Sequence, residues 1–185
     1  MVKIGIIIGS TRDGRVSIQV ADWVKSFTTD RTDAEFEIID IKDYNFEEFN
    51  NLPPGMLNRE YGAENVTEWS QKVDELDGFI FVTPEYNKSI SPSLKNAIDH
   101  LGPEWHNKAA GSVSYGSTLG VGATMALRQI LSNLNIAVVT PFGALSLFTD
   151  FENMSEFKPG EYHNDSIEAT IDQVVLWAKA MKTIR

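Results

Sequence analysis

The sequence predicts an α/β protein in which a parallel sheet of five strands is covered by helices on both faces. Two apolar runs, Val2–Ile8 and 78–83, lack the polar alternation of a half-exposed strand, which is typical of strands buried on both faces. Segments with helical spacing separate such runs along the chain. Strands that alternate with helices favour parallel pairing through right-handed crossovers, so the order of elements itself indicates this class.

The first third of the chain supplies two strands and one helix. Strand 2–8 leads through a turn at 9–15 into a helix over 16–27, and a second short strand covers 36–41. The apolar face of that helix comprises Val16, Val20, Trp23, Val24 and Phe27. The next segment, 42–65, is rich in Asn, Pro, Gly and acidic residues, and a loop of that length predicts a functional lid or a partly mobile region.

The remaining elements continue the alternation. Ser91 is a candidate N-cap and Pro92 suits the first helical position, so the two open a helix. In order, the predicted elements are a helix at 66–76, a strand at 78–83, a helix from 91 to about 101, a strand at 109–115, a glycine-rich loop at 116–122, a helix at 123–134, a strand at 136–140, a polar loop at 149–165 and a terminal helix at 166–183.

Composition limits the function classes. A chain of 185 residues without a linker or repeat suits a single domain over 1–185. The formal net charge of -10 argues against a nucleic-acid or acidic-membrane surface, since both require a basic face. The absence of cysteine excludes disulfides, thiol nucleophiles and iron–sulfur ligands. The first apolar run is too short for a signal peptide or a membrane span, so we expect a soluble cytoplasmic protein.

The segment 9–17 is a candidate anion site. Parallel sheets bind ligands at the carboxyl ends of their strands, and here a strand runs into a Gly/Ser/Thr turn and a helix N-terminus. Free N–H groups and the helix dipole converge at such a point. The spacing of Gly9 and Gly14 fits neither a Walker A loop nor a dinucleotide fingerprint, so a phosphomonoester suits it better, although an ordinary turn with solvated arginines is the alternative. The candidate side chains are Ser10, Thr11, Arg12, Arg15 and Ser17.

Two further unusual segments follow the third and fourth strands. In the turn 83–89, Tyr86 can stack on a flat ring and Asn87 can both donate and accept, although a capped turn before the helix is the alternative. In the segment 114–122, glycines allow the backbone to approach a planar ligand, although a flexible loop would have the same composition. Because all three segments follow strands, we expect them to meet at one edge of the sheet.

Other polar features do not indicate a site. The three histidines lie in unrelated contexts without ligand spacing, so no metal site is predicted. The acidic residues of 40–48 and 150–156 are interpreted as solvated loops.

At this point the motifs resemble a known family. Gly-Ser-Thr-Arg-x-Gly-Arg at 9–15, Thr-Pro-Glu-Tyr-Asn at 83–87 followed by Leu-Lys-Asn-Ala-Ile-Asp at 94–99, and Ser-Tyr-Gly at 114–116 are similar to the NADPH-dependent FMN reductases, which include quinone, azo-dye and chromate reductases. The resemblance runs in register to about residue 145. It implies a flavodoxin-like three-layer α/β/α sandwich with strand order 2-1-3-4-5.

The resemblance also implies the cofactor contacts. The residues implied to hold the FMN phosphate are Ser10, Arg12, Arg15, Val16 and Ser17. Those implied to border the isoalloxazine ring are Pro84, Glu85, Tyr86 and Asn87 on one side and Ser114, Tyr115 and Gly116 on the other. The family further implies a homodimer or homotetramer. Lys88 departs from the family because Gly is frequent at its position, and 146–185 match no motif of the family.

The implied activity is NAD(P)H-dependent flavin chemistry. Hydride would pass from NADPH or NADH to FMN, and then electrons to a quinone, flavin or similar small-molecule acceptor by a ping-pong mechanism, with no side chain as an obligatory acid or base. The alternative is a flavodoxin-type electron carrier without nicotinamide oxidation, which the acidic charge would suit. A flavin-free binding module is a third interpretation.

Overall fold

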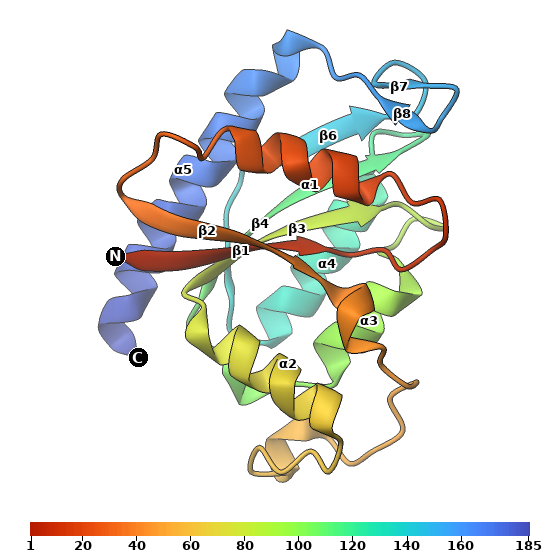
Figure 1. Cartoon of the computed structure of the whole chain (residues 1–185). Helices are drawn as coiled ribbons and strands as arrows, with labels where there is room; N and C mark the ends of the chain where they lie inside the picture. The colour runs from red at the N-terminus through yellow and green to blue at the C-terminus, as the bar shows by residue number, and fades with distance from the viewer.

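The computed structural model describes all 185 residues and confirms the predicted α/β class. The parallel sheet has the predicted order β2-β1-β3-β4-β5. Two helices cover one face and three cover the other, which gives three layers (Figure 1). The helices are α1 (Ser17–Ser26) and α5 (Asn164–Met181) on the first face, and α2 (Glu64–Glu75), α3 (Pro92–Asp99) and α4 (Val121–Asn133) on the second.

The strand register brings the predicted segments to one edge of the sheet. The four long strands are β1 (Val2–Ile8), β2 (Ala34–Asp40), β3 (Gly78–Pro84) and β4 (Ala109–Gly116). Ile8 is in register with Asp40 and Val82, and Pro84 is in register with Tyr115. The strands therefore end nearly level, and the chain leaves β1, β3 and β4 on the same side.

Alternate side chains of the central strands supply two separate cores. Ile4, Ile6 and Ile8 of β1 pack with Val20 and Val24 beneath α1 and α5. On the opposite face, the phenylalanine side chains of β3 pack beneath α2, α3 and α4 with fully buried tryptophans. The largest buried side chains of that second core are Trp69, Trp105, Phe79 and Phe81. Burial on both faces is the physical reason that these strands show no polar alternation.

The fifth strand differs from the prediction of one strand over 136–140. Its position beside β4 is shared by two short strands, β5 (Ala137–Val138) and β6 (Gly143–Ser146), which pair in parallel with successive parts of β4. Pro141 lies between them, and proline has no N–H to donate to a neighbouring strand. The sheet is therefore five strands wide, and its last edge is formed by two short strands instead of one.

Two predicted loops carry structure of their own. The polar segment 149–165 contains an antiparallel hairpin, β7 (Phe151–Glu152) with β8 (Glu156–Phe157), where no strand was predicted. The segment 42–65 contains the 3-10 turns η1 (Ile41–Tyr44) and η2 (Pro54–Met56). The side-chain amide of Asn96 in α3 fixes the middle of this segment. It accepts a hydrogen bond from the Phe49 N–H at 2.8 Å and donates one to the Glu47 carbonyl at 2.9 Å. None of the helices combines the length and the hydropathy that a membrane span requires.

Candidate functional site

The loops that follow β1, β3 and β4 meet at the carboxyl edge of the sheet, on the right of Figure 1. The Gly9 N–H donates to the Val82 carbonyl at 2.8 Å, and the Ser91 hydroxyl donates to the Gly9 carbonyl. The Glu85 N–H donates to the Tyr115 carbonyl at 2.8 Å. The first loop is thus tied to the second, and the second to the third, as the sequence predicted.

The start of α1 presents donors that no protein atom satisfies. No side chain caps this helix. Ser17, its first residue, is fully buried, and its hydroxyl lies near the Tyr115 phenol but has no hydrogen-bond partner within 3.5 Å. The N–H groups of Thr11 and Arg12 also donate to no protein acceptor among the turn and loop bonds. Unpaired donors beside the positive end of a helix dipole are suited to an anion, and a phosphate group fits that chemistry.

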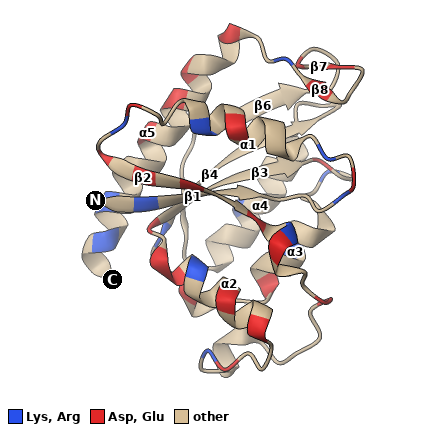
Figure 2. Cartoon of the chain, in the orientation of Figure 1, with Lys and Arg blue, Asp and Glu red and all other residues tan.

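The two arginines of this turn differ in their surroundings. Arg15 is only 10% exposed and forms a two-pronged ion pair with Asp40 at the end of β2. The Arg15 guanidinium also donates to the Ser10 carbonyl at 2.5 Å, so it holds the turn in shape. Arg12 is exposed and makes no ion pair. Figure 2 shows basic segments in the loop that joins β1 to α1, on a chain that is otherwise rich in acids.

The interpretation of two acidic residues as solvated was wrong. The Asp40 side chain is 17% exposed because Arg15 covers it. Asp150 is fully buried, accepts from the Ser146 N–H at 2.7 Å and pairs with His163 at 2.9 Å. These hydrogen bonds outweigh the effect of burial and lower the pKa of Asp150. Local composition gave no signal for the side-chain pairs, because Arg15 lies 25 residues from Asp40 and His163 lies 13 residues from Asp150.

The turn after β3 is tight and left-handed. Tyr86 and Ser89 exchange backbone hydrogen bonds of 2.9 and 3.0 Å. The two residues between them, Asn87 and Lys88, have φ values of 49° and 64°. Asparagine tolerates this conformation and glycine adopts it freely, whereas lysine rarely does. Glycine at position 88 would avoid this conformational cost. This explains in physical terms why glycine is frequent at this position in the family that the sequence resembles.

The Glu85 carboxylate joins this turn to the loop after β4. Its side chain is 6% exposed and accepts from the Gly122 N–H at 2.7 Å and from the Ala123 N–H at 3.4 Å, so it caps α4. Burial alone would raise the pKa of Glu85, but hydrogen bonds from Lys88, Thr118 and these amides lower it. A Cβ on Gly116 would lie 2.9 Å from the Cβ of Glu85, so a side chain there would displace it.

Two residues near the carboxyl end of β4 point inward. The Ser114 hydroxyl lies 2.9 Å from that of Thr124 in α4 and is fully buried. Tyr115 is buried with its ring centroid 5.6 Å from that of Phe151. Burial raises the pKa of Tyr115, so its phenol keeps its proton. Beyond the first turn, a cavity of about 280 Å³ opens beside Thr11, between that turn and Ser93 of α3.

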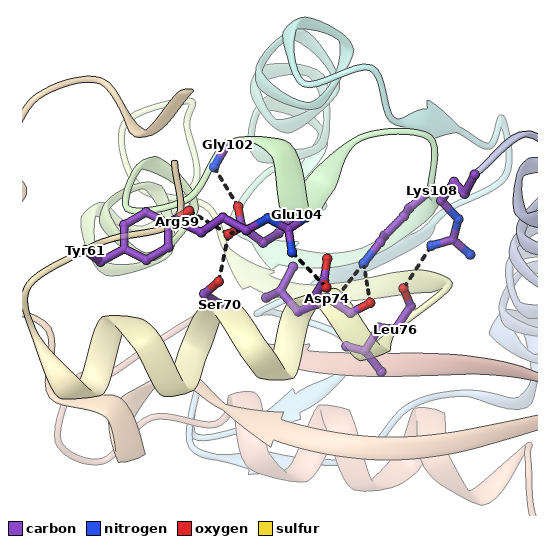
Figure 3. Close-up of polar contacts among 10 residues, drawn as sticks. Arg59, Tyr61, Ser70, Asp74, Leu76, Gly102, Glu104 and Lys108 are labelled. Carbon is purple, nitrogen blue, oxygen red and sulfur yellow. Dashed lines mark hydrogen bonds and ion pairs between the residues drawn. The ribbon is translucent and has the colours of Figure 1, made fainter. Parts of the chain in front are cut away.

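A second polar region, which sequence reasoning missed, lies away from these loops (Figure 3). Fully buried Glu104 accepts from the Tyr61 hydroxyl at 2.6 Å and from the Ser70 hydroxyl at 2.7 Å. Its other oxygen accepts from the Gly102 N–H at 3.2 Å. We call this region the Glu104–Lys108 cluster; its side chains are Arg59, Tyr61, Ser70, Asp74, Glu104 and Lys108.

Lys108 completes this cluster at the amino edge of the sheet, just before β4. Its ammonium is buried and donates to the carbonyls of Val73 at 2.5 Å and Asp74 at 3.1 Å. Burial lowers the pKa of Lys108 to about 8. Because Glu104 and Lys108 both have hydrogen-bond partners within the chain, the cluster ties α2 to the start of β4 and satisfies its buried polar groups internally.

Comparison with known proteins decides the family. Residues 2–150 match the family described as NADPH-dependent FMN reductase. The chain belongs to this family. An NAD(P)H-dependent FMN reductase of Schizosaccharomyces pombe is 35% identical over 150 residues, covering 80% of this chain and 74% of the relative. A Saccharomyces cerevisiae NAD(P)H-dependent FMN reductase is 34% identical, with 80% and 86% covered, and a Pseudomonas putida quinone reductase is 29% identical, with 98% and 97% covered.

Solved structures support the fold. A flavoenzyme NAD(P)H:(acceptor) oxidoreductase from Paracoccus denitrificans has a TM-score of 0.73 at 18% identity, covering 98% of this chain and 99% of that one. An NADH:FMN oxidoreductase has a TM-score of 0.69 at 21% identity, covering 95% and 89%. Family membership confirms the predicted oxidoreductase class and the predicted FMN and NAD(P)H, and these neighbours confirm the flavodoxin-like sandwich.

Proposed function

We propose that this chain is one FMN-binding domain that oxidises NAD(P)H and passes the electrons to a quinone, a flavin or a similar small acceptor by a ping-pong mechanism. The observation that carries the proposal is the buried, unpartnered Ser17 hydroxyl at the uncapped start of α1, at the edge where three loops meet. An unpaired buried hydroxyl costs free energy, so a ligand that accepts from it is the simplest reason for its presence.

The first turn would hold the FMN phosphate. Ser17 donates its free hydroxyl, Thr11 and Arg12 donate free N–H groups, and the Arg12 guanidinium is exposed beside them. Arg15 keeps the turn in shape through Asp40 and adds positive charge close by. The proposed phosphate residues are therefore Ser10, Arg12, Arg15, Val16 and Ser17.

The other two loops would border the flavin ring. Asn87 and Lys88 have backbone N–H groups that donate to no protein acceptor among the turn bonds, so they are available to a ring oxygen or nitrogen. The Glu85 carboxylate is committed to the start of α4 and acts by positioning. The proposed ring contacts are Pro84, Glu85, Tyr86 and Asn87 with Ser114, Tyr115 and Gly116.

Bound FMN would supply the redox chemistry, accepting hydride from NAD(P)H and returning electrons to the acceptor. The chain itself contributes binding, orientation and fixed N–H donors that stabilise negative charge. No side chain in these loops has the geometry of an obligatory acid or base, since Glu85 is ionised and fully hydrogen-bonded. We propose ping-pong kinetics because both substrates would react at the same exposed face of the flavin.

Initial-rate kinetics test this proposal. NADPH or NADH and a soluble quinone are varied together with the FMN-loaded protein. Parallel double-reciprocal lines are expected, because one substrate leaves before the other binds. Converging lines would contradict the ping-pong mechanism, and turnover close to the uncatalysed rate with both nicotinamides would favour an electron carrier instead.

We also propose a homodimer or homotetramer. Three apolar side chains, Leu119, Val121 and Met125, are exposed at the start of α4, next to the loop after β4. Covering them in a subunit interface would remove apolar surface from water. Light scattering of the purified protein gives the mass directly, and a monomer at micromolar concentration would overturn this part of the proposal.

A further inference from the structure

Lys88 occupies a backbone conformation that its residue type disfavours. Its φ of 64° follows the φ of 49° at Asn87, and the pair forms the tip of the turn between β3 and α3. A non-glycine residue that remains in this region needs compensating contacts from the surrounding structure. The side chain of Lys88 makes such contacts.

The Lys88 ammonium links the two loops proposed to border the flavin. It donates to the Glu85 carboxylate at 3.0 Å and to the Thr118 hydroxyl at 2.6 Å. The Thr118 hydroxyl in turn donates to the same Glu85 oxygen at 3.0 Å, which closes a triangle of hydrogen bonds. Thr118 lies in the loop after β4, so the triangle joins residues 30 positions apart.

The stem of Lys88 packs on the first turn of α4. A Cβ on Gly122 would lie 3.0 Å from the Lys88 Cα and 3.1 Å from its Cδ, so the absence of a side chain at 122 admits the lysine. The same glycine donates its N–H to the Glu85 carboxylate. Lys88, Glu85, Thr118 and Gly122 therefore form one packed and hydrogen-bonded unit, which we call the loop clasp.

We propose that Lys88 is a positioning residue whose ammonium fastens the loop after β3 to the loop after β4 and thereby slows the release of FMN. The inference rests on the proposed function, because it assigns the two loops to the flavin. A glycine at 88 would relieve the turn but would leave Glu85 and Thr118 without their cation. The Lys88 side chain is 68% exposed, whereas that of Glu85 is 6% exposed, so removing the ammonium disturbs no buried packing.

The test compares Lys88→Met with Lys88→Arg and with Lys158→Met. Methionine keeps the stem on Gly122 and removes the ammonium, while arginine restores a cation. Lys158 pairs with Glu152 and Glu156 in the β7–β8 hairpin, so the same substitution there controls for loss of one charge. Two quantities are measured for each protein: the FMN dissociation rate after dilution, and amide hydrogen exchange of Gly122 and Ala123 without FMN.

Lys88→Met is expected to raise the FMN dissociation rate and the amide exchange rates about fivefold, which corresponds to the loss of one net hydrogen bond. Lys88→Arg and Lys158→Met should give rates close to those of the parent protein. Unchanged amide exchange in Lys88→Met would overturn the loop clasp whether or not FMN binds. Faster exchange with an unchanged FMN release rate would overturn the claim that the clasp retains the cofactor. A parent protein that takes up no FMN would instead contradict the proposed function, with amide exchange still deciding the clasp.

Discussion

The Glu104–Lys108 cluster and the carboxyl-edge loops are both rich in buried polar groups, but they differ in how those groups are satisfied. Glu104 accepts three hydrogen bonds from protein donors, and Lys108 donates to two carbonyls. At the carboxyl edge, the Ser17 hydroxyl and nearby N–H groups have no partner. A saturated network stabilises the fold, whereas unpaired donors are available to a ligand, so buried polarity alone does not locate a site.

The largest expected effect is on stability at Glu104. Glu104→Ala leaves the Tyr61 and Ser70 hydroxyls without their buried acceptor, and we expect the free energy of unfolding to fall by about 3 kcal/mol. Urea denaturation measures the loss. Glu68→Ala, an exposed position on the same helix as Ser70, is the control and should change it by less than about 0.5 kcal/mol. Comparable losses in the two variants would mean that the cluster is not a structural anchor.

The second prediction concerns pH and Lys108. Burial lowers its pKa to about 8 in the folded state, against 10.5 ordinarily. Between these values the unfolded chain binds more protons than the folded one, so the contribution of Lys108 to stability rises with pH. Lys108→Met should reduce the slope of unfolding free energy against pH by about 1 kcal/mol per unit between pH 8.5 and 10. Parallel slopes for the two proteins would show that the ammonium is not desolvated.

Unlike Glu104→Ala, Ser17→Ala should not lower the stability of the FMN-free protein. Removing a buried hydroxyl that has no partner should leave the stability of the FMN-free protein unchanged or raise it by up to about 1 kcal/mol. The affinity for FMN should fall about tenfold, because a hydrogen bond to a charged phosphate is lost. Fluorescence titration measures the affinity. Ser26→Ala, at the exposed far end of α1, is the control. A destabilised apoprotein with normal FMN affinity would contradict the account.

Arg12→Ala gives the smallest expected change in stability. Arg12 is exposed and unpaired, so the free energy of unfolding should move by less than about 0.5 kcal/mol. FMN affinity should fall by about fivefold at low salt and by less at high salt, because screening weakens an exposed charge. A loss of affinity that is independent of salt would place Arg12 in a structural role instead.

The sequence predicted those features that depend on local pattern. Apolar runs predicted β1 and β3, and the rule that ligands bind at strand carboxyl ends predicted that the loops after β1, β3 and β4 meet. The sequence predicted one strand over 136–140, but it did not predict that the chain returns to β4 at Gly143. The Arg15–Asp40 and Glu85–Gly122 contacts depend on how distant segments pack, and a single sequence does not encode such pairings in any local signal.

Anaerobic mixing of FMN-loaded protein with NADPH or NADH, followed by a quinone, tests the central claim most directly. The carboxyl-edge loops are proposed to hold FMN where a nicotinamide can reach it. We predict that the long-wavelength absorption of oxidised flavin is lost in one turnover with at least one nicotinamide and returns when the quinone is added. A protein that binds no FMN, or whose bound FMN stays oxidised with both nicotinamides, would contradict the account.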